Sequence, residues 1–460
     1  MTTFHFETAL LPAGWADNVE VEVDRAGFIA RVTPGAAPAG PVVRGAAVPG
    51  MPNLHSHAFQ RAMAGLGEVA GPARDDGTPD SFWTWRQVMY GFVRRMTPDD
   101  IKAVALKLYV DMLKAGYTGV CEFHYLHHGP DGGAYAERAE TSMRLIDAAH
   151  EAGIGITMLP VLYAHGGFGG EAPSDGQRRF INDADGILEI IAAVRSRHGT
   201  NPNVAVGLAP HSLRAVTPEL LADALDGLAD GAPVHVHIAE QTKEVDDCLK
   251  WSGSRPVEWL LDHVAVGPRW CLVHATHMTD AETQALARSG AVAGLCPTTE
   301  ANLGDGLFPA ETFTAAGGHW GIGSDSHISV SPKEELRWFE YGQRLTTRRR
   351  NVLADGPGGS TGAALYLSAL MGGAQASARP VGAIAEGMRA DVVVLDTGTS
   401  PLSGRQGDAL LDAWLFAADH NPVSDVIVGG VPVVTGGVHA QEEIAEAGFQ
   451  AALKRLQEHA

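Results

Sequence analysis

Cysteine and positive charge are both scarce in this sequence. Its 460 residues include four cysteines, and none of them form a C-x-x-C pair, which argues against a disulfide framework or a thiolate zinc cluster. Lysine and arginine total 34 against 54 aspartates and glutamates, so the formal net charge is −20. Because this field repels phosphate backbones and anionic lipid surfaces, we expect neither nucleic acid nor a membrane as a partner.

Long apolar runs are absent as well. No stretch approaches the roughly 20 apolar residues of a membrane-spanning helix, and the first residues lack the basic and apolar segments of a secretion signal. With its scattered cysteines, the sequence therefore predicts a soluble protein of the reducing cytoplasm. Hydrophobic residues make up 45% and charged residues 19%, which suits a large core and argues against a disordered chain.

Short apolar runs alternate with longer amphipathic stretches from residue 46 onward. Eight runs can be counted, at residues 46–57, 116–123, 155–163, 204–212, 233–240, 271–277, 291–299 and 319–326. The stretches between them predict helices, such as the one that Thr97 can cap and Gly116 can end. Eight strand and helix units close a parallel barrel. We therefore expect an α/β fold with a TIM-like (β/α)8 barrel over residues 46–379.

The two ends of the chain differ from the middle. Residues 1–45 and 380–437 contain short alternating strands with glycine turns, such as VEVEVD and DVIVGGVPVVTGG. We expect both segments to pair as one small β-sandwich domain. Residues 438–460 are expected to form a C-terminal helix. The apolar residues near one face of that helix are Ile444, Phe449, Ala452 and Leu456.

Two histidines, His55 and His57, end the first apolar run. Alternate residues of a strand point to the same side, so both imidazoles can bind one ion, although an H-x-H pair is equally consistent with histidines that merely end a strand. Further candidates, His237, His274 and Asp325, lie where later runs become polar. Because barrel enzymes build their sites where the strands end, the set predicts a site for Zn²⁺ or Fe²⁺.

Two residues near His237 leave alternatives open. Glu240 follows it by three residues and is placed to act on a water at the metal, but it could equally be a carboxylate that starts a helix. His235 shares the face of His237 by strand alternation, so spacing alone does not distinguish the two as ligands.

Four motifs at barrel spacing, H-S-H (55–57), H-I-A-E (237–240), V-H-A (273–275) and S-D-S (324–326), resemble those of the amidohydrolase superfamily and its mononuclear-metal deaminase branch. The terminal segments are also similar, through GMRADVVVLD (387–396), so the resemblance covers nearly the whole chain. It implies that the metal ligands are His55, His57, His237 and Asp325, and that the catalytic, proton-transferring residues are Glu240, His274 and Asp325.

This resemblance also bears on the two open points. The H-x-A-E pattern begins at His237, so we assign His235 to a lower layer of the barrel. In binuclear members a lysine at the end of strand four bridges two metals, but VAVGLAPHS (204–212) contains no lysine. We therefore expect one divalent metal, with zinc preferred and iron as the alternative.

Within that branch the chain looks most like the family of formimidoylglutamate deiminases. The residues that carry this are NLHSHAFQR (53–61), FWTWRQVMY (82–90), EFHYLHH (122–128) and LAPHSLR (208–214). The resemblance implies hydrolysis of N-formimidoyl-L-glutamate to N-formyl-L-glutamate and ammonia in histidine degradation.

A glutamate-derived substrate carries two carboxylates, which the planar fork of arginine binds well. Arg214 and Arg86 are the candidates, although Arg86 could equally be a surface arginine packed on Trp83 or Trp85. The resemblance implies three further substrate contacts. These are Gln60, Tyr125 and His211, for which a helix cap, a core residue and a strand-end histidine are the structural alternatives.

Other functions are weighed against this one. Another mononuclear deaminase, acting on guanine, cytosine or an adenosine-like substrate, would need to recognise base edges rather than two carboxylates. GGSTG (358–362) matches a serine-hydrolase motif, but no buried strand precedes it, which favours Ser360 or Thr361 as a helix cap. A non-catalytic barrel binding protein is the third alternative, because a fold does not imply a function. We expect a homodimer.

Overall fold

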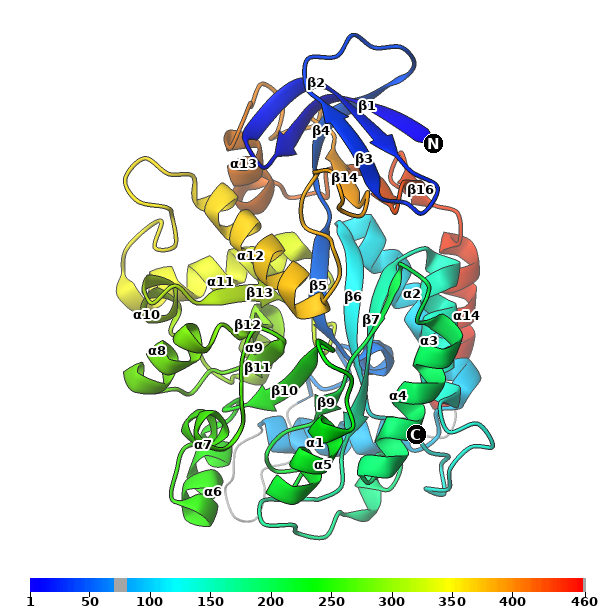
Figure 1. Ribbon diagram of the computed structural model, residues 1–460, viewed down its shortest axis with the longest axis vertical. Coiled ribbons are helices and arrows are strands. Elements are labelled where there is room, and N and C mark those ends of the chain that lie inside the picture. The colour runs from blue at the N-terminus through cyan, green and yellow to red at the C-terminus, as the bar shows by residue number, and fades with distance from the viewer. Residues whose placement is uncertain (70–80, 458–460) are drawn as a thin grey trace.

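The computed structural model describes residues 1–69 and 81–457, and its larger part is a barrel of parallel strands (Figure 1). The barrel strands are β5 (Met51–Ser56), β6 (Tyr117–His124), β7 (Gly155–Leu162), β8 (Val204–Val206) with β9 (Ala209–Pro210), β10 (Val234–Ile238), β11 (Trp270–His274), β12 (Val292–Leu295) and β13 (His319–Ile322). Parallel bridges at Leu208–Val234 and Ser56–Asp325 join the two arcs into a closed ring. Each of the eight predicted runs contains a barrel strand, and the predicted fold class is confirmed.

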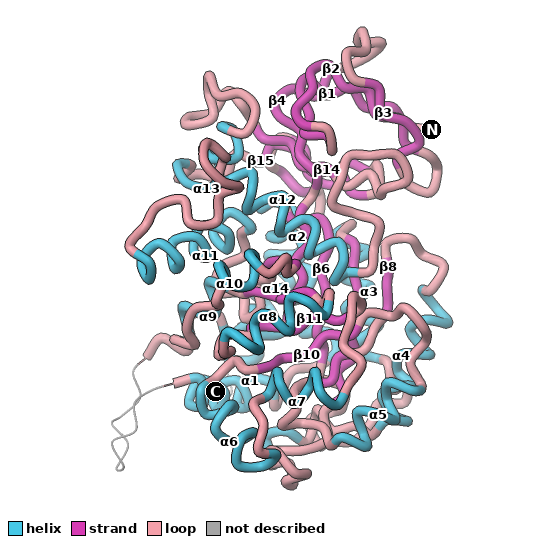
Figure 2. The backbone as a smooth tube through the Cα atoms, turned by 60° about the vertical axis from the view of Figure 1, so that its left-hand side comes forward, coloured by secondary structure: helices cyan, strands magenta, loops and turns pink. Residues whose placement is uncertain are grey.

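Helices cover the outside of these strands (Figure 2). The helices between residues 82 and 377 are α1 (Phe82–Val93), α2 (Pro98–Ala115), α3 (Glu140–Ala152), α4 (Ala184–His198), α5 (Pro218–Asp226), α6 (Thr242–Ser252), α7 (Pro256–His263), α8 (Asp280–Ser289), α9 (Pro297–Leu303), α10 (Ala310–Ala315), α11 (Pro332–Thr347) and α12 (Thr361–Ser377), and η1 (Ala58–Met63) and η2 (Asp175–Gln177) are short 3₁₀ turns. The Thr97 hydroxyl accepts from the Asp100 N–H at the start of α2, and Gly116 ends that helix at φ 106°. Ser360 caps α12 in the same way, as predicted for the GGSTG segment.

The two chain ends meet in one largely antiparallel sheet at one end of the barrel (Figure 2). Its strands are β1 (Thr2–Leu11), β2 (Gly14–Val23), β3 (Ile29–Thr33), β4 (Val42–Pro49), β14 (Val392–Leu395), β15 (Val423–Val428), β16 (Val431–Thr435) and β17 (Val438–His439), in the order β17-β16-β15-β14-β4-β1-β2-β3. Because β4 pairs with both β1 and β14, it joins the N-terminal and C-terminal strands. A cluster of buried apolar side chains from both the N-terminal and the C-terminal strands forms a core that is separate from that of the barrel.

The segment boundaries differ in detail from the predicted ones. The first apolar run is divided at Gly50, so β4 lies in the terminal sheet and the expected boundary at residue 45 falls inside that strand. This switch was not visible in the sequence because the run is apolar on both sides of Gly50. The helix α13 (Ala409–Ala417) interrupts the C-terminal strands and contacts α11 and α12 of the barrel.

The last helix, α14 (Glu442–Gln457), lies along α2 (Figure 1). Ion pairs join the two helices at Lys114 with Glu442 and at Asp100 with Arg455. The predicted helix spanned residues 438–460, of which 438–439 form β17 and 458–460 lie outside the described residues. The apolar pattern predicted that Ile444 is buried, but Ile444 is exposed and its neighbour Ala445 is buried instead.

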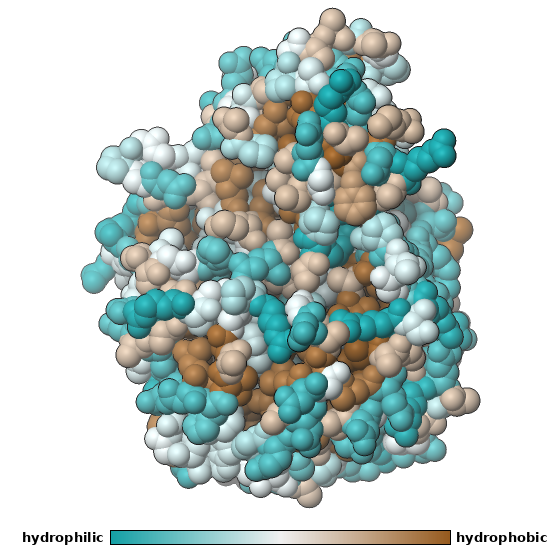
Figure 3. All heavy atoms as spheres, in the orientation of Figure 1, coloured by the Kyte–Doolittle hydropathy of each residue, from teal (hydrophilic) through white to brown (hydrophobic). Residues whose placement is uncertain are grey.

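Apolar side chains on the surface are interrupted by hydrophilic ones. On the face drawn in Figure 3, they gather in the lower half of the molecule and beneath the terminal sheet. Among the helices of the described residues, none is both long and apolar enough to cross a membrane.

Candidate active site

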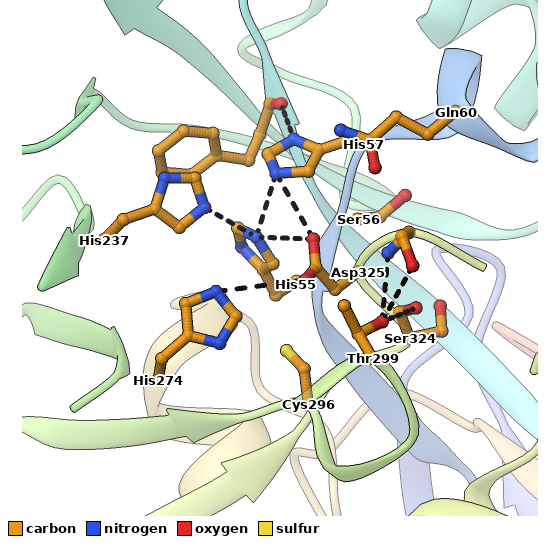
Figure 4. Close-up of polar contacts among 12 residues, drawn as sticks. His55, Ser56, His57, Gln60, His237, His274, Cys296, Thr299, Ser324 and Asp325 are labelled. Carbon is orange, nitrogen blue, oxygen red and sulfur yellow. Dashed lines mark hydrogen bonds and ion pairs between the residues drawn. The ribbon is translucent and has the colours of Figure 1, made fainter. Parts of the chain in front are cut away.

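Four side chains converge at the carboxyl ends of the barrel strands (Figure 4). His55 Nε2 lies 3.2 Å from His57 Nε2 and 3.0 Å from His237 Nε2, and Asp325 Oδ1 lies 3.4 Å from Nε2 of both His55 and His57. Donor atoms at the corners of a tetrahedron with metal bonds of about 2.0–2.1 Å are separated by about 3.3 Å. These four separations are close to that value. Two sets of three donors lie within 4.8 Å of one another, namely His55 with His57 and Asp325, and His55 with His237 and His274. His55 belongs to both sets, so the cluster offers candidate ligands for a metal ion.

The surroundings of His57 direct a ring lone pair toward the centre of this cluster. Nδ1 of His57 donates to the Phe123 carbonyl oxygen at 2.7 Å, so Nε2 is the unprotonated atom of the neutral ring. Burial lowers the pKa of His55 to about 3 and also lowers the pKa values of His57 and His237. Neutral imidazole is the form that binds metal, so the environment suits these residues for ligation.

His235 and His237 point to different places. The ring of His235 is fully buried and donates from Nε2 to the Ala376 carbonyl oxygen of α12 at 2.9 Å. His237 lies two residues closer to the end of β10, and its Nε2 is 3.0 Å from Nε2 of His55. The structure brings His237 into the cluster and leaves His235 in the layer below it.

His274, at the end of β11, lies beside the cluster and among carboxylates. Its Nε2 is 3.8 Å from Asp325 Oδ2 and 3.9 Å from Glu240 Oε1, and its Nδ1 is 3.3 Å from Glu300 Oε1. Burial by itself would lower the pKa of His274, but the charges of Glu240, Glu300 and Asp325 outweigh it and raise the pKa. Burial raises the pKa of Glu240. Both groups therefore hold a proton more readily than they would in water.

The backbone at these strand ends is strained. Positive φ values occur at Ala239 (49°), His274 (68°), Ala275 (47°), Asp325 (44°) and His327 (61°), none of which is glycine. Such conformations cost about 1–3 kcal/mol each and concentrate at functional sites. Here they turn the chain abruptly after β10, β11 and β13, which aims the His274 and Asp325 side chains at the same cavity.

A cavity with about 530 Å³ of empty space opens above the cluster. Its lining includes all five side chains expected to contact substrate, namely Gln60, Arg86, Tyr125, His211 and Arg214, together with His57, His237, Glu240, His274 and Asp325. The helix α1 contributes Phe82, Trp85, Met89 and Tyr90 to the same wall. Arg86 therefore lies on the cavity wall, a placement that the sequence left open.

Both arginines of the cavity have spare donors. The Nε atoms of Arg86 and Arg214 are buried and donate to no acceptor among the residues described. Arg214 is 6% exposed, and its Nε lies 4.0 Å from a Glu244 carboxylate oxygen, outside hydrogen-bond range. The guanidinium of Arg86 stacks 4.7 Å from the centre of the Trp83 ring. Buried donors of this kind can bind an anionic ligand.

Three other side chains carry polar groups into the cavity. Gln60 donates from Nε2 to the Tyr125 hydroxyl at 2.9 Å, while its buried Oε1 has no partner within the described ranges. The ring of His211 lies 4.9 Å from that of His237, and its Nδ1 is 3.1 Å from the Ser212 hydroxyl. The cavity thus offers hydrogen-bond donors and acceptors in addition to the arginines and the histidine cluster.

Sequence reasoning missed two supporting carboxylates. Glu300, which follows β12 in the segment PTTEAN, contacts His274, and the polar end of that apolar run was the available signal. Glu122 is buried in β6 and accepts from the Ser56 hydroxyl and the Ala58 N–H, both at 2.7 Å. It holds the chain on either side of His57. Its role could not be inferred locally because its partners are more than 60 residues away.

Comparison with known proteins agrees with this geometry. Residues 46–433 match the Amidohydrolase family, and residues 1–44 match the family described as formimidoylglutamate deiminase HutF, N-terminal domain. A formimidoylglutamate deiminase of Pseudomonas aeruginosa is 55% identical over 457 residues, which cover 99% of this chain and all of the relative.

Solved structures share the fold. The crystal structure of an amidohydrolase from Brucella melitensis is 51% identical, has a TM-score of 0.94, and matches over 99% of this chain and 100% of that one. An adenosine deaminase from Xanthomonas campestris with bound zinc has a TM-score of 0.79 over 99% of this chain and 98% of that one, and at 21% identity it supports the fold alone. By its matched family and its near full-length relatives, the chain belongs to the metal-dependent amidohydrolase family.

Proposed function

We propose that this protein hydrolyses the formimino group of N-formimidoyl-L-glutamate to give N-formyl-L-glutamate and ammonia, a step of histidine degradation. One observation carries the proposal: two arginines with unused buried donors line a cavity that also contains the histidine and aspartate cluster. A substrate with two carboxylates and a hydrolysable C=N bond matches both features. The 55% identity to a formimidoylglutamate deiminase supports the same substrate.

The proposed cofactor is one divalent metal, zinc in the first place and iron as the alternative. Its ligands would be His55, His57, His237 and Asp325, and the four donor separations given above are close to those in a metal shell. A metal held there would act as a Lewis acid and lower the pKa of water, which would supply the nucleophile of hydrolysis at neutral pH. The loop after β8 lacks the lysine that a second ion would need.

The side chains around the cluster would move the protons. Asp325 is placed on the cavity wall to accept a proton from the attacking water, and His274, with Nε2 3.8 Å from Asp325 Oδ2, would assist this transfer. Water adds to the amidine carbon, and the bond from that carbon to the terminal nitrogen breaks. Glu240 would deliver protons to this nitrogen, so that it leaves as ammonia rather than as an amide anion.

The remaining polar residues would hold the substrate. We assign the two carboxylates to Arg86 and Arg214, whose fork-shaped groups can each bind one in a bidentate manner. Gln60, Tyr125 and His211 belong to the same cavity lining as these arginines and the cluster, where they would orient the formimino group. Orientation of this kind is worth several kcal/mol in reactions of bound substrates.

A substrate panel tests the proposal directly. Ammonia release would be measured from N-formimidoyl-L-glutamate, guanine and cytosine, with metal analysis of the same sample. We expect release from the first substrate alone and about one metal ion per chain. Release from a nucleobase alone would favour the alternative deaminases, which recognise base edges, and absence of turnover by metal-loaded protein would favour a binding protein.

A homodimer in the cytoplasm stays a prediction. All four cysteines are free and buried, as suits a reducing compartment. Light scattering of the purified protein would check the dimer, and cell fractionation would check the location.

A further inference from the structure

A second hollow adjoins the cavity and shares Arg86 and Arg214 with it. Its empty space is about 1060 Å³, open solvent included, and its cationic lining residues are Arg86, Arg214, Lys243 and Lys250. Trp83 and Trp251 supply aromatic surface, and Glu171 and Asp247 are the carboxylates of the lining. We call this hollow the vestibule. Cations outnumber carboxylates in it, although acidic residues prevail in the chain as a whole.

Three of the four cations surround a single indole. Arg86 Cζ, Lys243 Nζ and Arg214 Cζ lie 4.7, 5.4 and 5.6 Å from the centre of the Trp83 ring. A cation over an aromatic face gains about 0.5–2 kcal/mol, which partly offsets the mutual repulsion of three positive groups. The ring therefore allows like charges to gather at one place in the vestibule.

The vestibule and the cavity share their arginines. Arg86 and Arg214 belong to the lining of both, whereas Lys243 and Lys250 line the vestibule only. Arg214 is nearly buried and its Nε has no acceptor in the described part of the chain, so a donor is available at the junction. A ligand carboxylate could thus pass from a lysine to an arginine without losing a cationic partner.

Ion pairs hold the two lysines of the vestibule in place. Lys243 and Lys250, on the first and third turns of α6, both bond to Asp247 between them, and the Lys243 side chain is 59% exposed. One carboxylate therefore serves two ammonium groups, which leaves positive charge at the rim. The chain has a net charge of −20 and repels a dianion as a whole, whereas the local positive charge of the vestibule attracts one.

We propose that the vestibule is an outer binding site for the dicarboxylate substrate, where Lys243 captures one carboxylate before Arg86 and Arg214 receive the pair. The proposal rests on the proposed function for the identity of the substrate. It gives Lys243 a part in substrate capture and none in the hydrolysis itself.

The test compares Lys243→Gln and Lys243→Arg with the wild type in steady-state kinetics at low salt and at about 0.5 M salt, where charges beyond a few ångströms are screened. At low salt we expect Lys243→Gln to lower kcat/KM by roughly 3- to 10-fold with kcat preserved, and Lys243→Arg to restore most of it. The difference should vanish at high salt. Equal salt dependence in Lys243→Gln and the wild type would overturn the proposal.

A matched control separates this effect from a general loss of charge. Lys114 pairs with Glu442 between α2 and α14, as Lys243 pairs with Asp247, but it lines neither hollow. Lys114→Gln removes the same charge and should leave kcat/KM and its salt dependence as in the wild type. A drop equal to that of Lys243→Gln would mean that net charge alone is responsible, which contradicts capture at the vestibule.

Direct binding distinguishes this proposal from the proposed function. If the wild type released no ammonia from N-formimidoyl-L-glutamate, the function would fail, yet the outer site could still be measured with glutarate by calorimetry. We expect glutarate to bind Lys243→Gln roughly 3- to 10-fold more weakly than it binds the wild type at low salt. Equal affinities in the two proteins would overturn the outer site whatever the reaction.

Discussion

Glu300 Oε1 lies 3.3 Å from His274 Nδ1, and this contact orients the imidazole so that Nε2 faces Glu240 and Asp325. The same carboxylate oxygen accepts the Cys296 N–H at 2.9 Å, which holds Glu300 at the start of α9. A carboxylate behind a histidine fixes its tautomer and stabilises its protonated form. Glu300 is therefore a positioning residue for His274.

We predict that Glu300→Gln lowers kcat about 10- to 100-fold without loss of metal, because the histidine loses its orienting charge while the cluster is untouched. Removing a carboxylate also lowers the pKa of His274, so the limb of the pH–rate profile that depends on this group should move to lower pH. Glu311→Gln, in a surface pair with Arg349, is the control. An unshifted profile would contradict the positioning role.

His237→Ala and His235→Ala should differ in kind. Loss of His237 removes a proposed ligand, so metal content and activity should both fall. Loss of His235 removes a buried ring and its bond to Ala376, which should cost about 1–3 kcal/mol in the free energy of unfolding while metal content stays near the wild-type value. Elemental analysis and urea unfolding of both variants would check this, and metal loss in His235→Ala alone would reverse the assignment.

Glu240→Gln should keep the metal and lose turnover. The side chain lies 3.9 Å from His274 and lines the cavity, and a positioned proton donor contributes about 10²–10⁴-fold to a rate. Metal content and kcat would be measured on one preparation, with Glu219→Gln on the exposed side of α5 as the control. A kcat near that of the wild type would remove Glu240 from the proton path.

Arg214→Ala should reduce kcat/KM by roughly 30-fold to several thousand-fold, as expected if a buried charge pair worth about 2–5 kcal/mol is lost. Metal content should not change, because Arg214 does not belong to the histidine and aspartate cluster. The wild type should discriminate against an amidated substrate, and the variant should lose much of this preference. Equal kcat/KM of the wild type for acid and amide would exclude the dicarboxylate argument. Arg288→Ala on α8 provides a surface control.

The contact between α2 and α14 should make stability depend on pH. Asp100 accepts from the Thr97 N–H and hydroxyl and from Arg455. Burial acts to raise the pKa of Asp100, but these hydrogen bonds outweigh it and lower the pKa below the usual value. The carboxylate therefore stabilises the fold above the pKa of the unfolded chain, and this contribution is lost as the pH falls through the lowered value.

Asp100→Asn should accordingly lower the free energy of unfolding by about 0.5–2 kcal/mol at pH 7, and by less near pH 3. Urea unfolding at both pH values would measure the difference. Asp99→Asn is the matched control, since that neighbouring side chain is 80% exposed and its pair with Arg144 lies at the surface. A deficit that is equal at the two pH values would mean that the charge of Asp100 is not involved.

The roles of the supporting residues could not be predicted from the sequence because their partners are distant in the chain. Glu122 lies in an apolar run and meets Ser56 and Ala58 only after β5 and β6 pair. Arg86 reaches the cavity because α1 lies across its wall, and nothing in the spacing of FWTWRQVMY requires that placement. Ile444 shows the limit for a single helix, since the smaller Ala445 is the residue that packs inward.

The sequence by itself determined the order of the eight barrel strands, the helices between them and the polar residues at the strand ends. These features follow from hydrophobic periodicity and chain order, which act over a few residues. Only the tertiary structure decided that the chain passes from β4 of the terminal sheet into the barrel at Gly50. It also decided that His237 rather than His235 contacts His55, and that Glu300 contacts Nδ1 of His274. Each of these depends on contacts between segments far apart in the chain, and local periodicity carries no information about such contacts.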